Sequence, residues 1–122
     1  MTKKKILIVD DDPVARQIMN ALLRTNYQTI MSGDAIGAFS EARKQNPDLV
    51  ILDLGLPGGG GFIVLQRLKS VPALSVVPVI VVSGLDRASH EQKALDEGAD
   101  RYVQKPADEQ KLLEMIQDLI GA

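Results

Sequence analysis

The chain has 122 residues, room for one compact core, and its 45% hydrophobic and 25% charged residues are typical of a globular domain. A net charge of −2 and an aromatic content of 3% argue against a nucleic-acid-binding surface, which needs a basic patch and stacking rings. The absence of cysteine excludes disulfides and Cys-based metal sites, and a reducing, cytoplasmic setting is expected.

The first predicted element is a strand at residues 6–9, preceded by three lysines and followed by three aspartates. This apolar run is too short for a signal peptide or a membrane span, so no membrane association is expected. Asp12-Pro13 is typical of a helix N-cap followed by a first-turn proline. The helix it opens carries apolar residues at helical spacing: Ala15, Ile18, Met19, Leu22 and Leu23.

A weaker strand at 27–31 and a helix with Ala35, Ala38, Phe39 and Ala42 on one face come next, and Asn46-Pro47 ends that helix. Apolar runs at 49–52 and 79–82 predict two more buried strands. Gly98 marks a helix C-terminus, a weaker strand is expected at 101–103, and apolar residues between 112 and 120 predict a closing helix.

Five strands therefore alternate with five predicted helices. The strongest strands lack alternation of apolar and polar residues, as parallel strands covered on both faces do. With no linker or low-complexity tract, residues 1–122 are predicted to form one domain with an open, doubly wound α/β fold.

Polar groups suited to phosphoryl chemistry follow four of the predicted strands. Asp10 and Asp11 follow the first, Asp53 the third, Ser83 the fourth and Lys105 the fifth. Ligands bind outside the carboxyl ends of the strands in such sheets, so these side chains are expected at one site. Each one alone could be an ordinary cap, loop hydroxyl or solvated lysine, and it is their convergence that indicates function.

The carboxylates of Asp10, Asp11 and Asp53 would repel one another unless a cation neutralises them, and an oxygen-only site suits Mg²⁺. Asp53 is the candidate nucleophile, because a carboxylate can attack a phosphoryl donor to give an acyl phosphate. Lys105 and Ser83 are expected to contact the other phosphoryl oxygens, since phosphoryl transfer depends mainly on positioning and charge stabilisation.

The pattern resembles the receiver domains of two-component response regulators over nearly the whole chain, from Lys5 to Ile120. The matching motifs are residues 6–11, residues 52–57 followed by Gly61, residues 78–83, and Lys105-Pro106. The spacings of 30 residues from Asp53 to Ser83 and 22 from Ser83 to Lys105 also resemble the family.

The resemblance implies a flavodoxin-like sheet in the order 2-1-3-4-5 and a phosphorylation-activated signalling switch. It implies that Asp10, Asp11, Asp53 and the Gly55 carbonyl bind Mg²⁺, and that Asp53 accepts a phosphoryl group from a histidine kinase or phosphotransfer protein. Such a domain catalyses only its own phosphoryl transfer and dephosphorylation, so it is not expected to be an enzyme in the usual sense.

Activation is expected to draw Ser83 toward the phosphate and to let Tyr102 turn inward. This movement would remodel the surface of the fourth helix, fifth strand and fifth helix, which a downstream effector protein or domain would read. The family's usual cis peptide falls at Lys105-Pro106.

Glycines mark where the chain departs from the family pattern. Gly55 and Gly84 stand where larger residues are usual, so we expect an open site and a short-lived phosphorylated state. The run from Gly58 to Gly61 lacks the ending of a nucleotide-binding P-loop and is predicted to be a mobile loop.

Two alternatives remain at this stage. Asp10-Asp11-Asp12-Pro13-Val14 fits the nucleophile motif of haloacid-dehalogenase-like phosphohydrolases, with Asp10 as nucleophile, but that interpretation leaves Asp53 without a role. The second alternative is a pseudo-receiver, an interaction module that is never phosphorylated; such modules typically lose one of the site residues, whereas this chain has them all.

Overall fold

The sheet has five parallel strands in the order β2-β1-β3-β4-β5. The computed structural model describes residues 3–121; residues 1, 2 and 122, which the single-domain prediction includes, lie outside them. The strands are β1 (Lys5–Val9), β2 (Gln28–Ser32), β3 (Leu49–Leu52), β4 (Val79–Ser83) and β5 (Arg101–Gln104). The predicted doubly wound α/β fold and its implied strand order are both confirmed.

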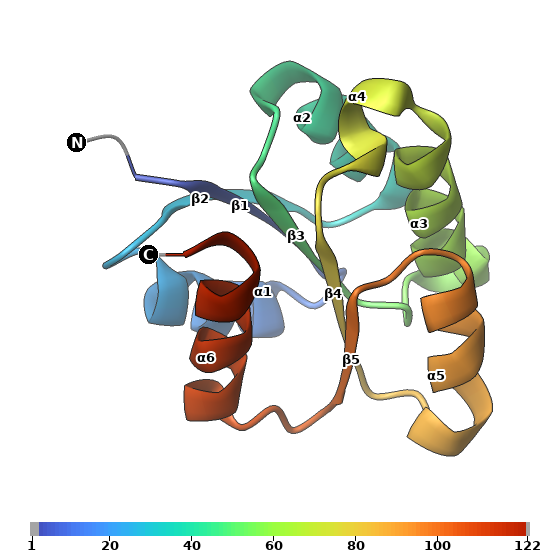
Figure 1. Ribbon diagram of the computed structural model, residues 1–122. Coiled ribbons are helices and arrows are strands. Elements are labelled where there is room, and N and C mark those ends of the chain that lie inside the picture. The colour runs from blue at the N-terminus through green and yellow to red at the C-terminus, as the bar shows by residue number, and fades with distance from the viewer. Residues whose placement is uncertain (1–2, 122) are drawn as a thin grey trace.

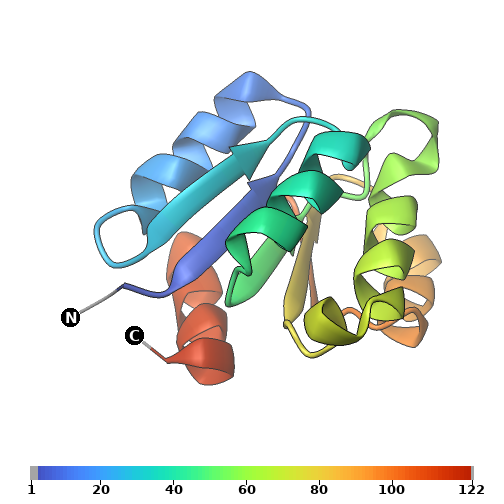
Figure 2. The ribbon, with the colours of Figure 1, turned by 90° about the horizontal axis from the view of Figure 1, so that it is seen from above.

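Helices cover both faces of this sheet (Figures 1 and 2). α1 (Pro13–Leu23) and α6 (Glu109–Ile120) pack on one face. α2 (Ala35–Gln45), α3 (Gly60–Ser70) and α5 (Arg87–Asp96) pack on the other. Within the described part of the chain, no helix is long and apolar enough to cross a membrane.

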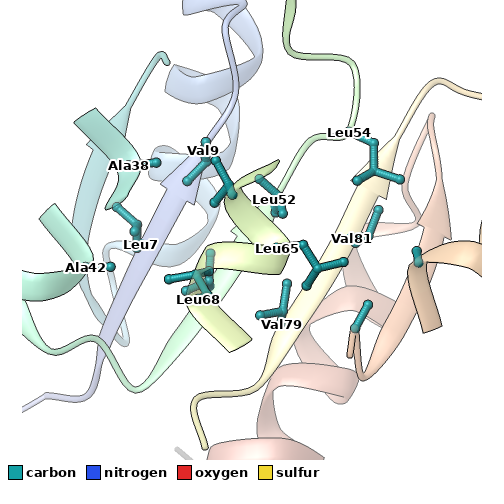
Figure 3. Close-up of a cluster of buried hydrophobic side chains, with 14 of the residues drawn as sticks. Leu7, Val9, Ala38, Ala42, Leu52, Leu54, Leu65, Leu68, Val79 and Val81 are labelled. Carbon is teal, nitrogen blue, oxygen red and sulfur yellow. The ribbon is translucent and has the colours of Figure 1, made fainter. Parts of the chain in front are cut away.

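Alternate residues of each central strand point into two separate hydrophobic clusters. In β1, Leu7 and Val9 face the α2/α3/α5 side, whereas Ile6 and Ile8 face the α1/α6 side. Figure 3 shows the first cluster, in which Leu65 of α3 lies against the β3 and β4 side chains. Every residue of β3 and β4 is buried, which explains why their sequences show no alternation of apolar and polar residues.

The predicted helix boundaries are confirmed at three positions. The Asp12 carboxylate accepts a hydrogen bond from the Val14 amide and caps α1. Asn46 ends α2 in the left-handed conformation, with φ of 47°, and Gly98 follows α5 with φ of 110°. Asp12 fixes where α1 begins, and Asn46 and Gly98 mark where the chain leaves α2 and α5 toward the next strands.

Two predictions about the middle of the chain are wrong. The described residues contain six α-helices rather than five, because Pro72 begins a separate one-turn helix, α4 (Pro72–Ser75), between α3 and β4. The glycine run is also not simply a loop. Gly58 and Gly59 are left-handed and belong to the 3-10 turn η1 (Pro57–Gly59), but Gly60 and Gly61 form the first turn of α3.

Close packing explains why position 61 in that first turn is glycine. A Cβ at Gly61 would lie 2.5 Å from the Leu54 Cα and 2.7 Å from the Asp53 carbonyl oxygen. The helix therefore approaches the segment after β3 more closely than any side chain would permit. This approach holds the backbone that follows Asp53.

Candidate functional site

Strand pairing brings the predicted site residues to one edge of the sheet. Val9 pairs with Leu52, so Asp10 and Asp53 follow adjacent positions on neighbouring strands, and the Asp53 amide donates to the Val9 carbonyl at 2.9 Å. The Lys105 amide donates to the Ser83 carbonyl at 2.8 Å. The register of the parallel sheet thus positions four of the five side chains.

Lys105 forms ion pairs with two of the carboxylates. Its Nζ lies 2.8 Å from Asp10 Oδ2 and 3.2 Å from Asp53 Oδ2. Asp10 is 7% exposed and Asp53 8%, so these charges meet where water screens them only partly. The predicted convergence of Asp10, Asp53 and Lys105 is present in the structure.

Asp11 completes a group of three carboxylates at the same edge. Asp10, Asp11 and Asp53 each offer an oxygen, and these oxygens lie within 4.8 Å of one another. Asp11 is exposed, whereas the other two are buried. Hard oxygen ligands that leave water-accessible positions fit Mg²⁺, which usually takes one or two carboxylates and keeps several waters.

Burial and charge oppose each other at the two key titratable groups. Burial raises the pKa of Asp53, and the Gly55 amide and Lys105 offset this only in part, so the pKa lies above its ordinary value. Burial lowers the pKa of Lys105, but its hydrogen bond to Asp10 and the charge of Asp53 outweigh burial and leave that pKa raised. Lys105 therefore stays charged, whereas burial destabilises the charged form of Asp53.

Positions 55 and 84, which follow β3 and β4, carry no side chain. The Gly55 amide donates to Asp53 Oδ1 at 2.8 Å, and a Cβ at Gly55 would lie 3.2 Å from that same oxygen. A Cβ at Gly84 would meet nothing within 4 Å. Both glycines are exposed, and Gly55 lies directly beside the buried Asp53.

Ser83 and Tyr102 are linked through Leu85. Ser83 is fully buried, and its Oγ accepts a hydrogen bond from the Leu85 amide at 3.0 Å. The Tyr102 ring is 3% exposed, and its hydroxyl donates to the Leu85 carbonyl at 3.0 Å. Tyr102 therefore lies inward in this structure, and both side chains hold the same peptide segment after β4.

The Lys105-Pro106 peptide is cis, as the resemblance implies.

A groove of about 490 Å³ runs between α1 and α6 and ends at Asp10, Asp53 and Lys105. The apolar side of α1 is therefore less buried than its sequence predicts: only Leu23 of that helix is buried, and Ile18 is 57% exposed. The apolar residues at helical spacing are on one side of α1 as predicted, but α6 does not cover all of them.

The geometry gives the hydrolase alternative no support. Asp12, the second aspartate of that motif, is exposed and caps α1. Asp53, which has no role in the hydrolase mechanism, is buried and paired with Lys105.

Sequence reasoning missed one further residue at this edge: Arg16, whose Nη1 donates to the Asp10 carbonyl at 2.7 Å. A cation six residues after Asp10 was the only signal for it.

The comparisons with known proteins agree on one family. A family model described as the response regulator receiver domain matches residues 6–117. Protein PilH of Pseudomonas aeruginosa is 32% identical over 118 residues, which are 96% of this chain and 98% of PilH. The DNA-binding dual master transcriptional regulator RpaA of Synechocystis is 33% identical over 117 residues, 95% of this chain and 48% of RpaA. The chain thus spans nearly all of PilH and about half of RpaA.

One solved structure matches the fold of nearly the whole chain. The receiver domain of sensor histidine kinase PA1611 from Pseudomonas aeruginosa, solved with a magnesium ion coordinated in its active site cleft, matches with a TM-score of 0.89 and 26% identity. The match covers 99% of this chain and all of that one.

Proposed function

The chain belongs to the response regulator receiver domain family of two-component signalling, and from this premise we propose that it is a switch activated by phosphorylation of Asp53 with Mg²⁺. The phosphoryl group comes from a histidine kinase or phosphotransfer protein, and it alters binding to a downstream effector protein or domain. The observation that carries this proposal is the pairing of the Lys105 ammonium with both Asp10 and Asp53, beside a third carboxylate.

Asp53 is held as a nucleophile would be. The Gly55 amide donates to Oδ1, and the Lys105 ammonium donates to Oδ2. In the proposed transfer, a carboxylate oxygen of Asp53 forms a bond to phosphorus as the phosphorus–nitrogen bond of a phosphohistidine breaks. The electron pair of that bond stays on the histidine nitrogen, and the product is an acyl phosphate.

The acidic cluster would hold the metal through Asp10, Asp11, Asp53 and the Gly55 carbonyl. When bound, Mg²⁺ supplies positive charge that offsets both the carboxylates and the transferring phosphoryl group. This chain's own contribution to that charge is Lys105, which is free to move from the carboxylates to a phosphoryl oxygen. The Ser83 hydroxyl keeps its proton available for a second phosphoryl oxygen, because Oγ acts as acceptor in its bond to Leu85.

The contacts of Leu85 support the proposed switch. If Ser83 moves toward the phosphoryl group, its bond to the Leu85 amide breaks or carries Leu85 with it, and Tyr102 is attached to the carbonyl of that residue. Leu85 leads into α5, and Tyr102 lies in β5. A change at Asp53 is thereby transmitted to the surface of α5, β5 and α6, where the effector binds.

Return to the resting state completes the cycle. Water attacks phosphorus, the bond to Asp53 breaks, and inorganic phosphate leaves with the carboxylate restored. The chain acts on its own phosphoryl group and not on a stream of substrate molecules, so it is a signalling switch and not an enzyme in the usual sense. We place it in the cytoplasm, and neither nucleic acid nor a membrane is a partner of this domain.

Phosphorylation by acetyl phosphate and Mg²⁺ tests the proposal. We expect a mass increase of one phosphoryl group, mapped to Asp53 by peptide sequencing and lost when EDTA removes the metal. Asp53→Asn should abolish labelling and keep the fold, whereas Asp118→Asn, at an exposed aspartate of α6, should label normally. Stoichiometric labelling of Asp53→Asn would refute the assignment, and label on Asp10 would favour the hydrolase mechanism.

A further inference from the structure

Arg16 reaches from α1 to the end of β1 and binds the backbone of a site residue. Its Nη1 donates to the Asp10 carbonyl at 2.7 Å, a short, charge-assisted hydrogen bond. Arg16 is half-buried, and no carboxylate among the described residues forms an ion pair with it. The guanidinium therefore contacts the main chain of the acidic cluster and does not neutralise a particular carboxylate by pairing.

Gly33 provides the space that the guanidinium occupies. A Cβ at Gly33 would lie 2.7 Å from Arg16 Nη1 and 3.3 Å from its Cζ, and the three nearest atoms to it all belong to this guanidinium. No L side chain would fit at position 33 without moving Arg16. Arg16 of α1 thus packs against Gly33, which follows β2, although neither residue belongs to the site predicted from the sequence.

The contact adds to a set of bonds that fixes Asp10. The Asp10 amide donates to the Ser32 carbonyl at 3.1 Å, which joins it to β2. Its Oδ1 accepts from the Asp12 amide at 3.0 Å, and its Oδ2 accepts from Lys105. Arg16 is the only side chain in this set that holds the Asp10 backbone, at the point where the chain turns from β1 toward α1.

We propose that Arg16 is a positioning residue for the cation site, and that Gly33 is glycine so that the Arg16 guanidinium can hold the Asp10 backbone. The inference rests on the proposed function, since it assigns these residues to the binding of Mg²⁺ by Asp10, Asp11 and Asp53. Partners that orient a metal ligand typically change metal affinity 10- to 100-fold when they are removed. Arg16 acts through the position of Asp10 and needs no contact with the ion.

The charge of Arg16 has the opposite effect on the cation. A guanidinium close to a cation site repels a second cation, so a role through charge alone predicts tighter Mg²⁺ binding when the charge is removed. A role through position predicts weaker binding. Gly33→Ala separates the two effects, because it displaces the guanidinium and leaves the charge in the protein.

The experiment measures Mg²⁺ affinity of the full chain by nuclear magnetic resonance titration of the backbone amides of residues 10–12. The variants are Arg16→Met, Gly33→Ala and the double variant, with Gln17→Met, an exposed residue of the same helix, as control. We expect each single variant to weaken Mg²⁺ binding about tenfold or more. The double variant should bind no more weakly than Arg16→Met, because the added methyl group has nothing left to displace.

A second readout needs no metal. In the parent and Gln17→Met proteins, the bonded guanidinium of Arg16 should give an exchange-protected side-chain resonance, and Gly33→Ala should abolish it. Unchanged or tighter Mg²⁺ binding by Arg16→Met, or additive losses in the double variant, would overturn the inference. A parent chain that fails to bind Mg²⁺ at all would instead overturn the proposed function, together with the inference built on it.

Discussion

Asp53→Asn should stabilise the metal-free protein near neutral pH, although it removes the proposed phosphoacceptor. Two unit charges interact with about 332/(ε·r) kcal/mol, with an effective ε of about 20 near a protein surface. Lys105 at 3.2 Å attracts the Asp53 carboxylate by about 5 kcal/mol, and an Asp10 oxygen at up to 4.8 Å repels it by about 3.5 kcal/mol, whereas the repulsion from the exposed Asp11 is screened by water.

Burial is the largest cause that raises the pKa of Asp53, and the bond from the Gly55 amide and the charge of Lys105 offset it only in part, so the charged carboxylate is destabilised in the folded protein. Asparagine has nearly the same shape and keeps one acceptor oxygen. We therefore expect the variant to gain on the order of 1 kcal/mol in the free energy of unfolding, because its buried group no longer carries a charge.

The sign of the pH dependence follows from the pKa of Asp53. Burial raises this pKa in the folded protein above its unfolded value of about 3.9. The stability that protonated Asp53 contributes is complete below the unfolded pKa and is lost as the pH rises through the folded pKa. The advantage of Asp53→Asn over the parent should therefore be largest at neutral pH and shrink as the solution is made acidic.

Urea unfolding followed by circular dichroism measures this difference, with Asp118→Asn as the control at an exposed carboxylate. Mg²⁺ should reverse the order, because a ligand at 100 times its dissociation constant stabilises the native state by about 2.7 kcal/mol and the variant lacks one ligand. A variant that is less stable than the parent in EDTA, or a difference that ignores both pH and Mg²⁺, would refute the reasoning.

Two further predictions concern the lifetime and the switch. Gly55→Ala should lengthen the half-life of the phosphorylated protein several-fold, because its methyl group would lie 3.2 Å from Asp53 Oδ1 and obstruct water. Gly84→Ala, whose methyl group meets nothing within 4 Å, tests whether the second glycine also admits water. Decay of the label measures both half-lives, and no slowing in either variant would contradict the prediction. Tyr102→Phe should lower the free energy of unfolding by about 1 kcal/mol through loss of the bond to the Leu85 carbonyl, with phosphorylation of Asp53 retained. Equal stability in urea would show that this bond contributes nothing.

The sequence predicted the elements whose signals are local. Strands β1, β3 and β4 are buried on both faces, so their composition alone identified them, and the polar residue after each strand identified the edge of the sheet. The cap at Asp12 depends on its own side chain, the one at Asn46 on a residue that tolerates the left-handed conformation, and both were also predictable.

What the sequence could not reveal depends on contacts between distant segments. Gly61 reads as part of a loop until α3 is seen to pack against Leu54, and Gly33 carries no signal until the Arg16 guanidinium lies against it. The exposure of Ile18 is a similar case, because an apolar helix stripe does not show how far a neighbouring helix will cover it. These features arise from tertiary packing, which the spacing of apolar residues in the sequence does not predict.

The acidic cluster persists because the sheet beneath it is rigid. Leu52 and Val9, the paired residues just before Asp53 and Asp10, are at most 1% exposed, and they cannot separate to relieve the repulsion without opening the core. One lysine cannot balance three carboxylates, so the resting site retains an excess of negative charge. In the proposed function this excess attracts a cation, and neutralising Asp53 is expected to stabilise the domain while it removes the proposed phosphoacceptor.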